Sequence, residues 1–197
     1  MKKYMNINNE INYKKFIKRL YIYRSLLYFN TTFICNNDYK DVKYIVHALN
    51  IKSRRKKIKY IYDTSCMMIN NRNKNINICG FINNKCFVQR KNNSNNCNGC
   101  CRLCIYQSSN GCTTSNLACK LFNCSEVKKR FEVYKFNDIN LLKLLSLKNR
   151  IIVKNDYFSK REDVLRDLYC IGIIIPCIRL IYRLVRNYIY YLKNNFE

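Results

Sequence analysis

The chain has few of the residues on which enzymes commonly depend. Of its 197 residues, one is histidine, one is proline and four are glycine. A single histidine excludes most cysteine–histidine dyads and histidine-rich metal sites, and so few glycines leave no glycine-rich phosphate-binding loop. The twelve acidic residues show no pair placed for acid–base chemistry. The composition therefore disfavours an enzyme and offers no candidate catalytic residue.

An export signal and a membrane-spanning segment are also missing from the sequence. The first ten residues have a charged start but no apolar core and no small-residue cleavage site, unlike a secretory signal. The uncharged apolar run 168–178 has 11 residues, which cover about half of a bilayer core. We expect this run to form a buried core helix, with contact to a membrane surface as the alternative. The sequence thus predicts a cytoplasmic protein without a transmembrane segment.

Acidic residues are scarce relative to basic ones. Twelve Asp and Glu stand against 37 Lys and Arg, which gives a net charge of +25. Abundant Asn, Lys, Ile and Tyr indicate an AT-rich genome, which raises the lysine content without any function. That bias does not explain the few acids, because glutamate codons are A-rich as well. A charge of this size favours polyanions or an acidic membrane surface as partners.

Two basic stretches are candidate nucleic-acid-binding sites. The first is a predicted loop, followed by two tyrosines, that holds Arg54, Arg55, Lys56 and Lys57. The second is a helical stripe with spacings of four and three residues, formed by Arg179, Arg183 and Arg186. Arginine and lysine contact phosphates, and aromatic rings stack on bases. The alternative for both stretches is a solvated charged face.

The periodicity of apolar residues predicts an α+β fold. Helices are expected over 10–29, 38–50 and a leucine-rich stretch 138–148, and short strands over 60–62, 79–81 and 85–88. A capping box at residues 159–162 predicts a long helix to about Tyr191, kinked at Pro176. The expected organisation is an N-terminal helical region with a basic loop (1–62), a cysteine-rich metal-binding module (63–130) and a C-terminal helical region (131–197).

Nine of the 13 cysteines lie within one short stretch, and they are the candidate metal ligands: Cys79, Cys86, Cys97, Cys100, Cys101, Cys104, Cys112, Cys119 and Cys124. A C-x2-C turn lets two thiolates converge on one tetrahedral ion, and two such pairs adjoin here. In a reducing cytosol this favours structural zinc over disulfides. The alternative cofactor is an iron–sulfur cluster held by Cys97, Cys101 and Cys104. Which thiols would share an ion stays open.

Residues 97–124 resemble a group of cysteine-rich bacterial proteins marked by the core C-x2-C-x-Y…GCT…L-x-CKL-x2-C. This resemblance covers about a quarter of the chain when the approach from Cys79 is included. More distantly, the density of cysteines is similar to that of the YkgJ-type cysteine-cluster proteins, which implies zinc or iron. Both resemblances imply a metal-binding module, and neither implies an activity. The sequence as a whole predicts a metal-stabilised protein that binds nucleic acid, with a redox protein or a membrane-surface or protein-partner scaffold as alternatives.

Overall fold

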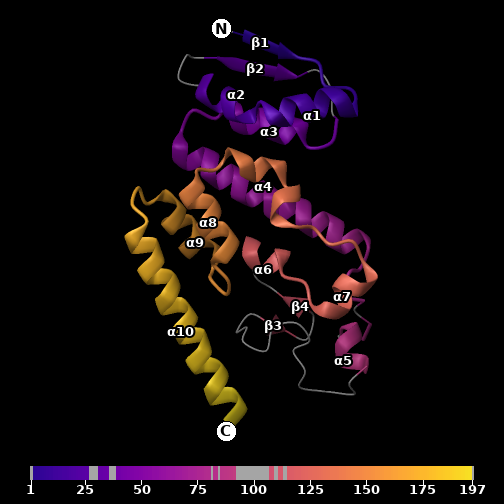
Figure 1. Cartoon of the computed structure of the whole chain (residues 1–197). Helices are drawn as coiled ribbons and strands as arrows, with labels where there is room; N and C mark the ends of the chain where they lie inside the picture. The colour runs from indigo at the N-terminus through magenta and orange to yellow at the C-terminus, as the bar shows by residue number, and fades with distance from the viewer. Residues whose placement is uncertain are drawn as a thin grey trace. The chain divides into compact units, whose positions relative to one another are not determined.

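A computed structural model of the chain describes residues 2–26, 31–35, 39–80, 82–83, 85–91, 107–108, 111–112 and 115–196 (Figure 1). Helices account for 67% of these residues, and a two-stranded parallel sheet makes the fold loosely α+β. The chain divides into two units. The first comprises Met1–Ser65 and Lys135–Arg150, and the second comprises Cys66–Tyr134 and Ile151–Glu197. Each unit is therefore built from two separate segments, unlike the three consecutive regions expected from the sequence.

The first unit combines a small sheet with helices. Its elements are β1 (Lys2–Met5), α1 (Glu10–Lys18), α2 (Leu20–Leu26), β2 (Thr32–Cys35), α3 (Val42–Asn50), the first part of α4 (Arg54–Asn75), the 3-10 helices η2 (Phe136–Asp138) and η3 (Asn140–Leu144), and the start of α8 (Leu147–Asn155). Strands β1 and β2 run parallel, with Lys2 opposite Thr32 and Met5 opposite Cys35. Parallel neighbours need a crossover, which α1 and α2 supply.

Helices α1, α2 and α3 follow the apolar spacing of the sequence. Asn9 caps α1, because its side-chain oxygen accepts a hydrogen bond from the backbone N–H of Asn12 at 2.9 Å. The predicted helix 10–29 is helical up to Leu26 with a break at Arg19, and its last residues lie outside the described part of the chain. Helix α3 buries the face that its spacing predicts: Val42, Ile45, Val46 and Leu49.

A buried polar contact joins the two segments of the first unit. The Tyr13 hydroxyl donates to Asp41 Oδ1 at 2.6 Å and accepts from Asn140 Nδ2 at 2.7 Å. Burial raises the pKa of Asp41 and also raises the pKa of Tyr13, because each charged form would lose its hydration. The contact fixes the N-terminal helix to a residue 127 positions later in the chain.

The leucine-rich stretch 138–148 is not the single helix that was predicted. It forms η3 and the start of α8, and Leu141, Leu142, Leu144 and Leu145 are buried. Helix α8 begins anew because Ser146 Oγ accepts a hydrogen bond from the backbone N–H of Asn149 at 3.3 Å.

The predicted basic loop and the predicted strand 60–62 are wrong, since both lie in α4. Buried residues recur along this helix at steps of three and four: Ile58, Ile61, Tyr62, Ser65 and Ile69. These steps place the buried residues on one face of a helix. The alternation of Tyr60 and Tyr62, which suggested a strand, therefore does not indicate a strand here. Arg54 is the first residue of α4.

The second unit is held together by helices. Its elements are the rest of α4, α5 (Phe87–Lys91), β3 (Gln107–Ser108), β4 (Gly111–Cys112), α6 (Leu117–Leu121), α7 (Ser125–Arg130), most of α8, α9 (Arg161–Tyr169) and α10 (Ile174–Phe196). Strands β3 and β4 pair antiparallel. The predicted strand 85–88 is wrong, because Phe87 begins α5, and only an isolated bridge joins Ile82 and Lys85.

The C-terminal helix is two helices instead of one. Helix α9 ends at Tyr169 and α10 begins at Ile174. Pro176 lies in the first turn of α10, where a missing N–H leaves no helical hydrogen bond unmade, so it starts a helix instead of kinking one. Ser159 forms no capping box, because its hydroxyl bonds the Asp156 side chain and Lys160 is the N-cap.

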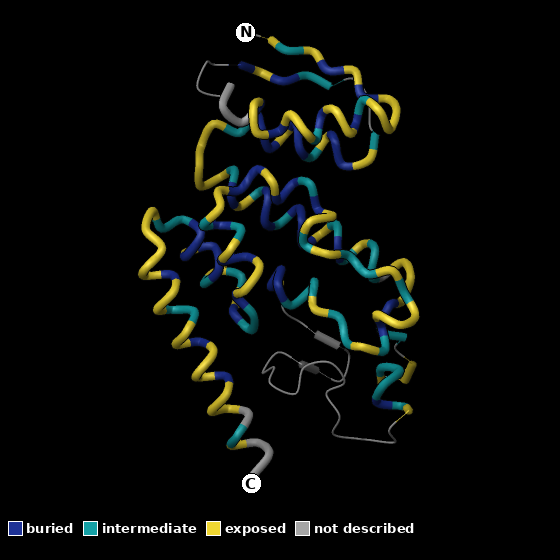
Figure 2. The backbone as a smooth tube through the Cα atoms, in the orientation of Figure 1, coloured by how far each residue is buried: buried dark blue, intermediate teal, exposed yellow. Residues whose placement is uncertain are grey.

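The apolar run 168–178 is not the buried core helix expected from the sequence. Ile171, Ile174, Ile175 and Ile178 are all exposed. Figure 2 shows α10 as an exposed helix with a few regularly spaced buried positions. Among the described helices, none is long and apolar enough to cross a membrane.

Candidate functional site

The most elaborate polar site among the described residues is a buried ion network in the second unit. Arg183 on α10 bonds two carboxylates, Asp156 Oδ2 at 2.6 Å and Asp167 Oδ2 at 2.8 Å. Arg179, one turn earlier, bonds Asp167 Oδ1 at 2.8 Å. The side chains of Asp156, Asp167 and Arg183 are at most 5% exposed. Two carboxylates and two guanidinium groups thus balance in charge at a place with little water.

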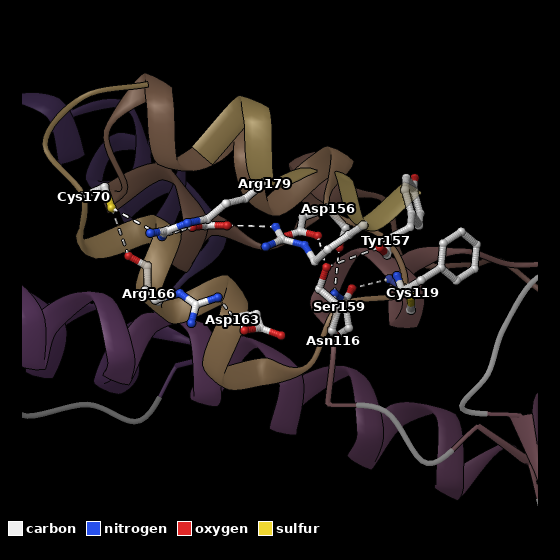
Figure 3. Close-up of polar contacts among 12 residues, drawn as sticks. Asn116, Cys119, Asp156, Tyr157, Ser159, Asp163, Arg166, Cys170 and Arg179 are labelled. Carbon is white, nitrogen blue, oxygen red and sulfur yellow. Dashed lines mark hydrogen bonds and ion pairs between the residues drawn. The ribbon is translucent and has the colours of Figure 1, made fainter. Parts of the chain in front are cut away.

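A second layer of hydrogen bonds extends the network (Figure 3). The Ser159 hydroxyl donates to Asp156 Oδ1. Asn116 Nδ2 donates to the backbone oxygens of Asp156 at 2.7 Å and Ser159 at 3.2 Å. Asn116 Oδ1 accepts from the backbone N–H of Cys119 at 2.9 Å and so caps α6. The network therefore joins α6, α9, α10 and the segment between α8 and α9.

The groups of this network have a structural role. Both oxygens of Asp156 and both oxygens of Asp167 accept hydrogen bonds within the unit. Burial raises the pKa of Asp156, against the opposing effects of Ser159 and Arg183. A carboxylate without an accessible lone pair is poorly suited to bind a substrate or a metal. We assign the network to the positioning of α10.

This geometry corrects the predicted nucleic-acid-binding stripe on α10. Arg183 is 4% exposed and is bound by two carboxylates, so it does not face solvent. Arg179 is half-buried and paired with Asp167. Arg186 is exposed. The three arginines thus form no common exposed surface, because Arg183 faces the interior of the second unit while Arg186 faces solvent.

The basic residues at 52–59 do form an exposed surface, although on a helix. Four basic residues, Arg54 to Lys57, occupy the first turn of α4, which has no acidic residue. Lys52, Lys56 and Lys59 are exposed, whereas Lys57 is half-buried and its Nζ lies 3.4 Å from the Leu49 oxygen. We call the exposed residues Lys52, Arg54, Arg55, Lys56 and Lys59 the α4 basic face.

A second basic feature of the first unit is a pocket that the sequence did not reveal. An open cavity of about 290 Å³ lies between β1 and the helices α1 and α2. Lys3, Lys15 and Arg19 line it together with Asn6 and Asn12, and none of its lining residues is acidic. Lys3 Nζ lies 4.7 Å from the centre of the Tyr23 ring in the same pocket. Asn12, Lys15, Phe16, Arg19 and Tyr23 follow helical spacing, but β1 becomes their neighbour only through folding, so the sequence gave no signal for the pocket.

The cysteines that were predicted to bind metal are described only in part. Cys79, Cys86, Cys119 and Cys124 are half-buried residues of the second unit. Cys97, Cys100, Cys101 and Cys104 lie outside the described residues, as does the side chain of Cys112. Within the described part of the chain, no three cysteine, histidine or acidic side chains are grouped so as to share a metal ion.

One described cysteine has a contact that suits a metal ligand. Cys119 Sγ accepts a hydrogen bond from the backbone N–H of Phe158 at 3.2 Å. An N–H group directed at sulfur stabilises a thiolate and is a common outer contact of thiolate ligands.

Comparisons with protein-family models, curated proteins and solved structures find no match for this chain.

Proposed function

We propose that the first unit binds nucleic acid through the α4 basic face. The observation that carries this proposal is the concentration of exposed basic side chains at the start of α4, without an acid in that turn. The whole unit contains 19 Lys and Arg against five Asp and Glu. A positive potential of this kind attracts the phosphate backbone and makes the affinity depend on salt.

The helix itself adds to this potential. The N-terminus of an α-helix carries a partial positive charge, so basic residues there repel the helix dipole instead of complementing it. A bound phosphate group at this end of the helix offsets that repulsion. The arrangement is therefore more stable with an anion present than without one.

The tyrosines next to the α4 basic face do not serve as stacking platforms. Tyr62 is fully buried, and the ring of the half-buried Tyr60 lies 4.5 Å from the His47 ring within the unit. Base stacking requires an exposed ring face. We therefore propose binding to the phosphate backbone, with little dependence on base sequence. The pocket of Lys3, Lys15 and Arg19 offers a second place for a phosphate group.

Filter binding at graded salt tests this proposal with a charge-matched pair of variants. The first variant replaces Lys52, Lys56 and Lys59 with Gln. The control replaces Lys128, Lys154 and Lys160, which are exposed residues of the second unit, with Gln. We expect the first variant to lose about tenfold or more in affinity and to flatten the salt slope by about 2–3, since each phosphate contact contributes about 0.9 to that slope.

The control variant should stay within about threefold of the wild type, because it loses the same net charge at another place. Equal losses in the two variants would show that net charge alone attracts the nucleic acid. An affinity that does not fall with rising salt would refute the electrostatic basis of the proposal.

We further propose that the cysteine-rich segment binds zinc in the reducing cytosol. The support is the adjoining pair of C-x2-C spacings at residues 97–104, together with the N–H contact to the Cys119 sulfur. Elemental analysis of gently purified protein is expected to find about two zinc ions per chain, as eight thiolates would hold. Chelation should then lower the thermal midpoint, because a structural metal contributes to folding.

Replacement of single cysteines locates the metal. Cys97→Ser should lower the zinc content, whereas the exposed Cys177 on α10 provides a control in Cys177→Ser. Iron with a broad absorbance near about 400 nm would instead favour the iron–sulfur alternative at Cys97, Cys101 and Cys104. Protein without metal, or with these sulfurs joined as disulfides, would refute both.

A further inference from the structure

Helix α10 presents an apolar surface to the outside of its own unit. Exposed apolar residues recur along it at steps of four and three, which places them on one stripe. We call this set the outer stripe: Ile174, Ile178, Ile181, Val185 and Tyr188. Ile174, Ile178 and Ile181 are 73%, 62% and 61% exposed. An exposed apolar surface of this extent marks an interaction site more often than a plain solvent face.

The opposite side of α10 is polar and buried. Arg183 and Asn187 are 4% and 2% exposed, and Arg183 is bound by two aspartates. Residues two positions apart on a helix are separated by about 200°, so Arg183 lies opposite Ile181, and Asn187 opposite Val185. The ion network therefore holds the polar side of α10 against its unit and leaves the apolar side outward, the reverse of an ordinary surface helix.

The apolar surface is broader than one stripe. Ile175, Tyr182 and Ile189, at steps of seven residues, are also exposed beside the outer stripe. A two-stranded coiled coil has a narrow apolar seam flanked by charged residues of both signs. Helix α10 has apolar residues in those flanking positions and contains no Asp or Glu at all. A second copy of the helix would thus leave apolar residues uncovered and would bring like charges together.

Basic residues follow one edge of this surface. Arg179, Arg186 and Lys193 recur at steps of seven residues; Arg186 and Lys193 are exposed, and Arg179 is half-buried. Tyr182, Tyr188 and Tyr190 add rings with a polar end to the exposed side. Apolar residues flanked by basic and tyrosine side chains suit the boundary between lipid tails and anionic headgroups.

We propose that α10 lies flat on an anionic membrane surface. The outer stripe enters the acyl boundary over about 21 Å, the length of residues 174–188 at about 1.5 Å per residue. Arg186 and Lys193 lie at the level of the headgroup phosphates, with their aliphatic parts along the apolar boundary. This contact uses the second unit and is independent of nucleic-acid binding by the first.

Vesicle sedimentation of the nuclease-treated full chain tests the proposal. Vesicles of phosphatidylglycerol and phosphatidylcholine are compared with vesicles of phosphatidylcholine alone. The test variant carries Ile178→Ser and Ile181→Ser. The matched control carries Ile11→Ser and Ile22→Ser, which replace two isoleucines of the first unit that are 66% and 55% exposed. All four side chains are exposed, so both variants should fold.

We expect the wild type and the control to bind the anionic vesicles with partition coefficients within about threefold of each other, since neither loses apolar contact with lipid. The test variant should bind at least about tenfold less, because two apolar side chains no longer enter the boundary. The variant lacking Lys52, Lys56 and Lys59 should keep most of its vesicle binding, which separates a failure of this proposal from a failure of nucleic-acid binding.

A second readout locates the contact on α10. Cys177 is exposed beside the outer stripe, so vesicles should slow its alkylation, followed by mass spectrometry, while Cys35 of the first unit is unaffected. Three results would overturn the proposal: no binding to anionic vesicles, equal binding by the test variant, or unchanged alkylation of Cys177. Self-association of the wild type that the test variant abolishes, without vesicle binding, would show that a second copy covers the helix.

Discussion

Arg183→Ala is expected to lower the free energy of unfolding by about 3–5 kcal/mol, the usual cost of removing one partner from a buried ion pair. In the described part of the chain, the variant removes the guanidinium that pairs with Asp156 and one of the two guanidinium groups that pair with Asp167. Both carboxylates are almost fully buried, so the loss of the guanidinium leaves their charge poorly compensated. Urea unfolding followed by far-ultraviolet circular dichroism measures the loss.

The control for this variant is Arg186→Ala, three residues later on the same helix. Arg186 is exposed, so its loss should change the stability by no more than about 0.5 kcal/mol. If Arg183 served instead to bind phosphate from the surface, its replacement would weaken nucleic-acid binding and leave the stability near that of the Arg186 variant. Such a result would refute the structural role of the network.

The loss in the free energy of unfolding caused by Arg183→Ala should depend on pH. Burial already raises the pKa of Asp156 above its unfolded value, and loss of Arg183 raises it further. A carboxyl with a raised folded-state pKa contributes stability below its unfolded pKa and loses it as the pH rises through the folded pKa. The difference between the variant and the wild type should therefore shrink as the pH falls from about 7 toward 4.

Asn116→Ala is expected to cost about 2–4 kcal/mol, which combines a lost helix cap with unpartnered buried groups. Asn116 is 1% exposed and provides three hydrogen bonds. Alanine would leave the oxygens of Asp156 and Ser159 and the N–H of Cys119 without this partner. Denaturant unfolding measures the effect, and thermal midpoints provide a second measure.

Two comparisons separate the cap from the buried contacts. Asn9→Ala removes an N-cap of the same kind from α1, but Asn9 is exposed, so its cost should be only about 0.5–1 kcal/mol. Asn116→Asp keeps the capping oxygen but loses the amide donors and places a carboxylate near two carbonyl oxygens, so it should cost at least as much as alanine. A loss for Asn116→Ala equal to that for Asn9→Ala would show that the buried contacts contribute nothing.

The sequence predicted the helices of the first unit better than the rest of the fold. In α1 and α3 the apolar residues follow one face and polar residues follow the other, so periodicity locates them. In α4 a basic run precedes two alternating tyrosines, a pattern typical of a loop followed by a strand. The helical spacing of the buried Ile58, Ile61 and Ile69 was overlooked for that reason. The helix forms there because one of its faces is buried against other segments of the protein. A short stretch of sequence does not show that burial.

The candidate sites were also predictable only where they do not depend on contacts between distant segments. Exposed basic residues at the start of α4 could be predicted, because surface charge is visible in the sequence. The burial of Arg183 could not, since it depends on Asp156 and Asp167 from other segments. A partial signal exists: Asp167 lies between Leu165 and Leu168, where a charged side chain on an otherwise apolar face indicates a buried partner.

The hydrogen bond between Tyr13 and Asn140 has a consequence for how the chain is made. On the ribosome, the N-terminal strand and helices emerge first, but their closing segment, residues 135–150, is translated only after the entire cysteine-rich stretch. The first unit thus waits, with part of its apolar interior uncovered, while the thiols of residues 79–124 are synthesised and meet the solvent. Contacts this distant in sequence slow folding, so the nascent chain is expected to need protection from aggregation during this interval.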